Sequence, residues 1–326
     1  MGVIVGHAYT ISPQPPLQDG VQALLGFDYS GSLAVKFFFF LSGILVTNSM
    51  MERPRLAAFL VARCFRLFPG LIVCVVFTAV VVGGIFTLQD RSEYFRSPLT
   101  GSYVWANITL RPQWFLPGLF EKNPSAVVNG SLWTLPIEFF CYMLLAGIGA
   151  VGLLRSRLLA TVIFLAAGGL LVWNHESLRW FGLPSEAWML PLFFCFGAAV
   201  AANKEVVMVD ARTVLGLALI TGLLHQTPIY PVLFCLFLFF FAFYISSLPN
   251  VRRISLPGDF SYGVYLYGFP AQQVAKLLWP GYGVHFNQFV GILLAVIFGA
   301  ISWYLVEKPA MKLGRSLQQR PFMSRI

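Results

Sequence analysis

The chain has 326 residues, of which 58% are apolar, 16% aromatic and only 11% charged. Soluble domains carry about a quarter charged residues, so the composition excludes a water-coated globular protein and predicts an all-α polytopic membrane protein. A β-barrel would show alternating segments of about ten residues, whereas the apolar runs here are continuous. A net charge of +9 would suggest a nucleic-acid partner in a soluble protein. Here the cations gather between apolar runs, so we expect membrane lipids and no nucleic acid as partners.

Apolar runs along the chain predict about ten transmembrane helices within one integral-membrane domain, 1–326. A spanning helix needs about 20 mostly apolar residues. The predicted spans are 1–11, 33–50, 67–88, 132–154, 158–173, 187–202, 213–224, 230–248, 260–279 and 289–306. The first covers about half a bilayer at 1.5 Å per residue, so we expect it to be the outer end of a truncated helix. Residues 103–120 are aromatic but contain two prolines, which predicts an interfacial or re-entrant segment.

Lysine and arginine clusters follow every second predicted span, beginning with four arginines between residues 53 and 66. Cytoplasmic loops carry such an excess of positive charge. The pattern places these loops and the basic C-terminal tail on one side of the cell (inner, cytoplasmic) membrane. We therefore predict a multi-pass protein with both termini in the cytoplasm.

His7 is the one histidine inside an apolar run. An ionisable residue at membrane depth is costly to keep, which favours a functional role. The alternative is a histidine that is satisfied by a neighbouring helix or by interfacial water. His175, His225 and His285 lie in loops or at span ends, where we expect solvated side chains.

Arg63 and Arg66 form an R-x-x-R sequence before the third span. At this spacing both side chains lie on one face of a helix, and paired guanidinium groups suit phosphate. Binding of lipid headgroups and a purely topological role are the alternatives. Lys36 begins the apolar run of the second span and could snorkel outward.

Two carboxylates lie at the ends of predicted spans. Glu138 follows Pro136 in the first turn of its helix, where a negative charge interacts favourably with the helix dipole. It could therefore be only a helix-start acid. Glu307 ends the last span, and we expect it to pair with Lys308 or with an arginine of an inner loop. Tyr262 and its neighbouring tyrosines predict an aromatic packing face.

Taken in chain order, these segments resemble the membrane-bound acyltransferase 3 family of polytopic O-acyltransferases, which modify surface glycans and related acceptors. The resemblance covers essentially the whole chain. The segments that carry it are the first-helix histidine, VKFFFFLSGIL, RCFR, SLWTLPIEFFCY, SYGVYLYGFP and SWYLVEKP. The matching positions are His7 (the essential histidine), Ser42 and Gly43 (F-F-x-L-S-G), Arg63 and Arg66 (R-x-x-R), Glu138 (the acid of the fourth span), and Glu307 and Pro309 (E-x-P).

The chain departs from the family pattern at three places. The family has a basic residue farther upstream of the histidine than this sequence reaches, which bears on the activity of the chain as given. Lys36 stands where an aspartate is common. Gly268 and Phe269 replace a frequent His-Trp pair before Pro270, which suggests a subgroup with a different acceptor.

The resemblance implies acyl transfer from a cytoplasmic acyl-CoA, with acetyl-CoA the expected donor, to a hydroxyl of a carbohydrate or lipid-linked glycan. Arg63 and Arg66 would bind the CoA phosphates, and His7 would act as general base, with Glu138 as a second catalytic residue. No metal is expected. One alternative is a proton-coupled transporter or exporter of a glycan precursor, with His7, Glu138 and Glu307 as relay groups. Another is a structural subunit of an envelope assembly.

Overall fold

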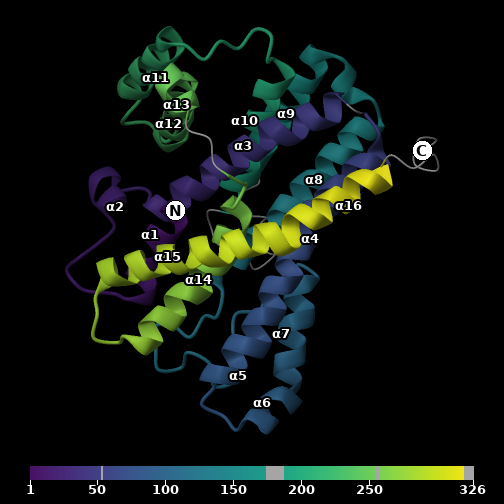
Figure 1. Cartoon of the computed structure of the whole chain (residues 1–326). Coiled ribbons are helices and arrows are strands. Elements are labelled where there is room, and N and C mark those ends of the chain that lie inside the picture. The colour runs from purple at the N-terminus through teal and green to yellow at the C-terminus, as the bar shows by residue number, and fades with distance from the viewer. Residues whose placement is uncertain (53, 174–186, 254–256, 319–326) are drawn as a thin grey trace. The chain divides into compact units, whose positions relative to one another are not determined.

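The structure, a computed structural model, describes residues 1–52, 54–173, 187–253 and 257–318. It is all-helical, 76% of it being helix, and the described residues contain no strand (Figure 1). His175 and the arginine at position 53 lie outside the described residues. The elements are α1 Gly2–Ile11, α2 Gly20–Leu25, α3 Ser30–Glu52, α4 Leu56–Phe77, η1 Thr78–Val82, α5 Gly83–Phe86, α6 Arg91–Arg96, α7 Pro98–Ile108, η2 Gly130–Thr134, α8 Leu135–Ala150, η3 Leu153–Arg155, α9 Arg157–Trp173, α10 Met189–Ala202, α11 Ala211–Leu223, α12 Tyr230–Ser247, α13 Pro249–Arg252, α14 Ser261–Leu278, α15 Val284–Ser302, η5 Trp303–Glu307 and α16 Lys308–Gln318.

The predicted all-α membrane fold is confirmed. A helix occupies each predicted span, but the exact number of ten spans is not confirmed. Five helical stretches in the described part of the chain are long and apolar enough to cross a membrane; they are Ser30–Glu52, Leu56–Phe86, Gly130–Ala150, Tyr230–Ser247 and Val284–Gln318. The remaining apolar helices are shorter or more polar. For example, α14 carries the fully buried Gln272 and Gln273.

Two helices extend well beyond the predicted spans. The third predicted span starts near residue 67, but α4 already begins at Leu56 and includes the R-x-x-R sequence. The last span continues through η5 into α16 and ends at Gln318. The first extension contains Arg63 and Arg66, and the second contains Lys308, Lys312 and Arg315. Arginine and lysine lower the hydropathy without ending a helix, because both have high helix propensity.

The aromatic segment 103–120 is part helix and part loop. Helix α7 ends at Ile108 and packs on α4 and η1. The side chain of Asn107 then organises the turn, donating to the carbonyl oxygens of Tyr103 (2.9 Å) and Gln113 (3.2 Å) and accepting from the Gln113 amide. This local network satisfies backbone groups that would otherwise be unpaired. The interfacial or re-entrant placement of the segment stays a prediction.

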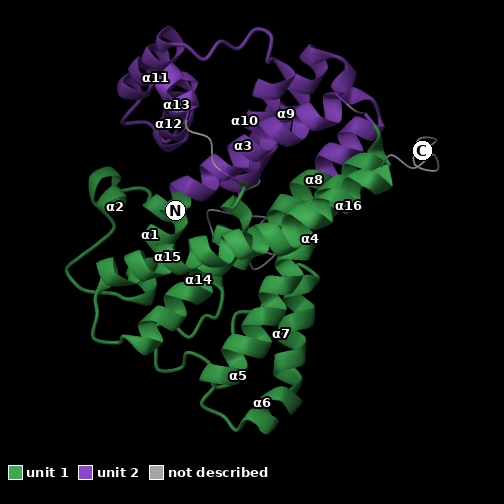
Figure 2. Ribbon diagram, viewed as in Figure 1, with its two compact units in different colours: residues 1–32, 55–142, 258–326 green, residues 33–54, 143–257 purple. Residues whose placement is uncertain are grey.

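The chain divides into two compact units (Figure 2). Unit 1 comprises residues 1–32, 55–142 and 258–326, and unit 2 comprises residues 33–54 and 143–257. In unit 1, α14 packs along α15, and α1 lies against both of these helices. The organisation as a single integral-membrane domain stays a prediction.

Unit 2 has a core of phenylalanine rings. Phe239 of α12 lies 5.3 Å from the ring centroids of both Phe40 of α3 and Phe193 of α10. Gly43 of α3 faces the carbonyl of Phe194, and a Cβ atom there would collide with that backbone. Small residues permit this close approach of two helices. Ser42 is buried beside it.

Candidate functional site

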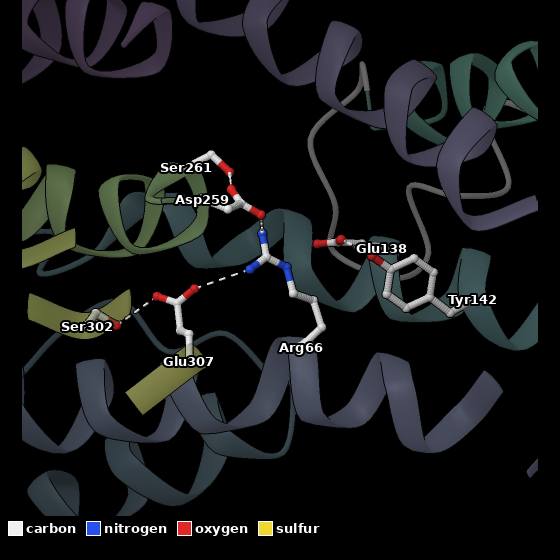
Figure 3. Close-up of polar contacts among 7 residues, drawn as sticks. All are labelled: Arg66, Glu138, Tyr142, Asp259, Ser261, Ser302 and Glu307. Atoms are coloured by element: carbon white, nitrogen blue, oxygen red, sulfur yellow. Dashed lines mark hydrogen bonds and ion pairs between the residues drawn. The ribbon is translucent and has the colours of Figure 1, made fainter. Parts of the chain in front are cut away.

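Arg66 is the centre of a partly buried charged cluster in unit 1 (Figure 3). Its Nη2 lies 2.7 Å from Asp259 Oδ2, in the segment before α14, and its Nη1 lies 3.4 Å from Glu307 Oε2. The guanidinium carbon also lies 5.6 Å from the centroid of the Tyr262 ring. Two carboxylates and an aromatic ring therefore fix the orientation of this guanidinium.

Glu307 reaches Arg66 from the end of a π-helical turn, η5. Its side chain is only 1% exposed, and Ser302 Oγ donates to its Oε1 at 2.8 Å. The five-residue separation of this pair matches the wide turn of a π-helix, an element often found at functional sites. The prediction that Glu307 pairs with an arginine is confirmed, whereas Lys308 instead lies 5.5 Å over the ring of Tyr304.

Pro309 follows η5 directly, near the start of α16. A proline inside a helix removes one backbone donor and crowds the preceding turn. The wide π-turn relieves this crowding, so the chain remains helical through the proline. The E-x-P sequence therefore both positions Glu307 and joins α15 to α16.

Glu138 lies in the first turn of α8, as predicted, and it is buried. The Tyr142 hydroxyl, one turn later, donates a hydrogen bond to Glu138 Oε1. The carboxylate interacts electrostatically with Arg66 and Arg63, and Figure 3 shows it facing the guanidinium of Arg66 from the side away from Glu307. Glu138 therefore belongs to the arginine cluster.

Arg63, one turn before Arg66, rests on aromatic rings. Its guanidinium carbon lies 5.9 Å from the ring centroid of Phe59 and 5.8 Å from that of Tyr142. No carboxylate of the described residues lies within 4 Å of it, and its Nε is buried without a hydrogen-bond partner there. Arg63 consequently keeps hydrogen-bond donors for a ligand.

His7 lies on α1, apart from the charged cluster. Its ring packs edge-on against Phe269 with centroids 4.9 Å apart, and its Nδ1 is buried without a partner among the described residues. Helix α1 is held by two glutamine side chains. Gln272 donates to the Ile4 carbonyl at 2.8 Å, and Gln288 donates to the Val5 carbonyl at 3.2 Å. The histidine is thus rigidly placed while one ring nitrogen remains unsatisfied.

Helix α14 connects His7 to the arginine cluster. Phe269 contacts His7, and Tyr262, seven residues earlier on the same helix, contacts Arg66. Seven residues of helix correspond to about 10 Å along its axis. The site in unit 1 therefore has two parts, an arginine–carboxylate cluster and a histidine, with α14 between them.

Three further residues that the sequence singled out, Ser42, Gly43 and Lys36, lie on α3. Ser42 and Gly43 belong to unit 2, where Gly43 permits a close helix contact and Ser42 is buried. Lys36 is buried, only 4% exposed, so the expectation that it snorkels outward is wrong. The described residues contain no group of three potential metal ligands.

Sequence reasoning missed Asp259 and the glycines beside the cluster. A Cβ atom at Gly263 would lie 2.7 Å from Gly299 Cα and 3.1 Å from Glu307 Oε1. A Cβ atom at Gly70 would lie 3.0 Å from the Tyr262 ring. Only the spacing of Gly70, four residues after Arg66, could have suggested that it faces the same site.

The fold defines a multi-pass membrane protein, and unit 1 brings together ionisable groups, two of them buried carboxylates. Such a pattern is typical of functional sites in membrane proteins. A family model described as an acyltransferase domain matches residues 1–307. The chain therefore belongs to the acyltransferase 3 family and is a transferase of acyl groups. The family and the enzyme class predicted from the motifs are confirmed.

Two curated relatives match almost the whole chain. An O-acetyl transferase of Shigella phage Sf6 is 30% identical over 321 residues, which cover 94% of this chain and 92% of that protein. Nodulation protein 10 of Rhizobium leguminosarum bv. viciae is 26% identical over 316 residues, which cover 88% of this chain and 84% of that protein. No solved structure matches the chain significantly.

Proposed function

We propose that this protein is a membrane O-acetyltransferase that moves an acetyl group from cytoplasmic acetyl-CoA to a hydroxyl of a surface carbohydrate or lipid-linked glycan. The family and the phage relative named O-acetyl transferase support it. The observation that carries the proposal is the two-part site of unit 1. His7 has an unsatisfied ring nitrogen, and α14 joins it to two arginines suited to phosphate.

At the histidine, the reaction is direct transfer. The neutral imidazole of His7 takes the proton of the acceptor hydroxyl as its oxygen attacks the thioester carbonyl carbon. The bond from this carbon to sulfur breaks, and the CoA thiolate leaves and accepts the proton. The products are the O-acetyl ester and CoA. The unpaired Nδ1 of His7 supports this role, because the acceptor hydroxyl would satisfy it.

At the other part of the site, Arg63 and Arg66 attract the CoA phosphates. The clusters of basic residues between spans support a cytoplasmic position for these arginines in the cell membrane, with both termini on that side. The pantetheine arm then extends along α14 toward His7, over about 10 Å. Glu138 positions the two arginines, since its carboxylate interacts with both.

The test measures transfer of label from radiolabelled acetyl-CoA to a glycan acceptor in membranes that contain the protein. We expect His7→Ala to abolish transfer, because it removes the proposed general base. His225→Ala is the matched control, since His225 is exposed in unit 2, and it should retain full activity. Full transfer by His7→Ala would refute the catalytic role. Movement of a glycan across the membrane without any acyl donor would instead support an exporter.

A further inference from the structure

A cavity of about 300 Å³ lies beside the arginine cluster, on the side of α16. The walls come from α4, η5, α16 and the segment before α14. The charged and polar side chains that line it are Arg63, Arg66, Asp259, Trp303, Arg315 and Gln318. Three of the described lining residues are cationic and one is anionic, so the cavity has an excess of positive charge.

Several hydrogen-bond donors of this cavity have no partner among the described residues. Arg63 Nε and Trp303 Nε1 are buried and unsatisfied. Arg315 makes no ion pair with any described carboxylate. Arg66, in contrast, already has Asp259 and Glu307 as partners. Buried donors without partners are costly, and a bound anion would satisfy them.

Helix α16 closes this cavity because it approaches α4 closely. Gly314 faces Phe65 of α4, and a Cβ atom at this position would lie 2.9 Å from Phe65 Cβ. The close contact brings Arg315, the next residue, to the cavity wall. Helix α16 begins at Lys308, directly after the residues that the family model matches. The α16 residues that line the cavity therefore lie beyond Pro309, the last motif residue.

We propose that α16 completes a binding pocket for the phosphorylated nucleotide end of the acyl donor. Arg63 and Arg315 bind phosphate oxygens from opposite walls, and Trp303 Nε1 donates a further hydrogen bond. Charge-assisted hydrogen bonds of this kind are the strong ones. The proposal rests on the proposed function, because it takes a nucleotide-bearing thioester as donor. A lipid headgroup offers the same phosphate chemistry, and the experiment separates the two sources.

The experiment compares the KM values of three donors, namely acetyl-CoA, dephospho-acetyl-CoA and acetyl-pantetheine, for the full chain in nanodiscs. We expect Arg315→Gln to raise the KM for acetyl-CoA about tenfold, the loss of one charge-assisted hydrogen bond, and to leave kcat and the KM for acetyl-pantetheine unchanged. Lys312→Gln is the matched control, because Lys312 is exposed on the same helix and does not line the cavity. It should behave as the wild type.

Three results would overturn the proposal. An unchanged KM for acetyl-CoA in Arg315→Gln is the first, and an equal rise for acetyl-pantetheine is the second. The third is a variant whose defect appears only in nanodiscs of anionic lipid, which would assign the pocket to a lipid headgroup. Direct binding of adenosine bisphosphate to the purified protein separates this inference from the proposed function. Binding that Arg315→Gln weakens supports the pocket even if no acetyl transfer to a glycan is detected.

Discussion

The two compact units differ in the side chains that make their clearest interior contacts, although Lys36 of unit 2 is buried too. Unit 1 buries carboxylates and amides, among them Glu138, Glu307 and Gln272, and most of these have specific partners. Unit 2 buries phenylalanine rings packed against one another, as around Phe239. Buried ionisable groups are costly at membrane depth and are kept where they serve a function.

Residues that look alike in the sequence have different surroundings in the two units. Gly43 and Gly263 are both glycines at close helix contacts, yet only Gly263 lies beside the charged cluster. Ser42 and Gly43 match the family pattern as well as Glu307 does, but they belong to unit 2, where Gly43 permits a close helix contact and Ser42 is buried.

Removal of the Arg66 side chain is expected to have the largest effect on acetyl transfer and on the stability of unit 1. Arg66→Ala leaves Glu307 buried without its partner, a change that costs about 3–5 kcal/mol in comparable buried pairs. We expect acetyl transfer to be lost and thermal stability to fall. The double variant Arg66→Ala/Glu307→Gln should recover much of the stability and none of the activity. Wild-type stability and transfer in the single variant would show that the pair is dispensable.

A glycine-to-alanine substitution in each unit should have an intermediate effect on stability and should affect activity in unit 1 alone. Gly263→Ala and Gly43→Ala each place a methyl group against the backbone of a neighbouring helix, and overpacking of this kind costs about 1–3 kcal/mol. We expect both to lower the thermal unfolding temperature in detergent. Activity per folded molecule should fall only for Gly263→Ala, because its methyl group also displaces Glu307. An equal loss of specific activity in both variants would contradict the division of roles.

The smallest effect concerns Asp259, whose side chain is 51% exposed. Exposed ion pairs contribute about 0–1 kcal/mol, so Asp259→Asn should leave thermal stability nearly unchanged. The substitution frees one guanidinium nitrogen of Arg66 and removes a negative charge from the cavity. We expect the KM for acetyl-CoA to fall by up to about fivefold. A higher KM would mean that Asp259 helps to hold the donor.

Much of the fold was predictable from the sequence, because long apolar runs identify helices with little ambiguity. The number of spans was not, since several apolar helices have only 10–17 residues, too few to decide by length whether they cross a bilayer. The start of α4 at Leu56 is not evident from hydropathy, because Arg63 and Arg66 interrupt the apolar run. Arginine favours the helix as strongly as leucine does.

The site was predictable where residues are close in sequence or match a motif, and unpredictable where tertiary contact decides. The spacing of Arg63 and Arg66 places them on one helix face. The partner of Glu307 could be predicted only as an arginine, because Arg66 lies 241 positions away. Asp259 was missed because a polar residue in a connecting segment carries no signal until the helices are packed.

The π-turn η5 also determines how α16 is rotated relative to α15, because it lies directly between these two helices. Each residue added to an α-helix turns its face by about 100°, so the wide turn at residues 303–307 determines the direction in which α16 presents its side chains. Deleting one residue there would rotate Arg315 and its neighbours away from α4 as a group. A single insertion or deletion at residues 304–307 would thus change the proposed donor pocket in one step, without altering any residue that lines it.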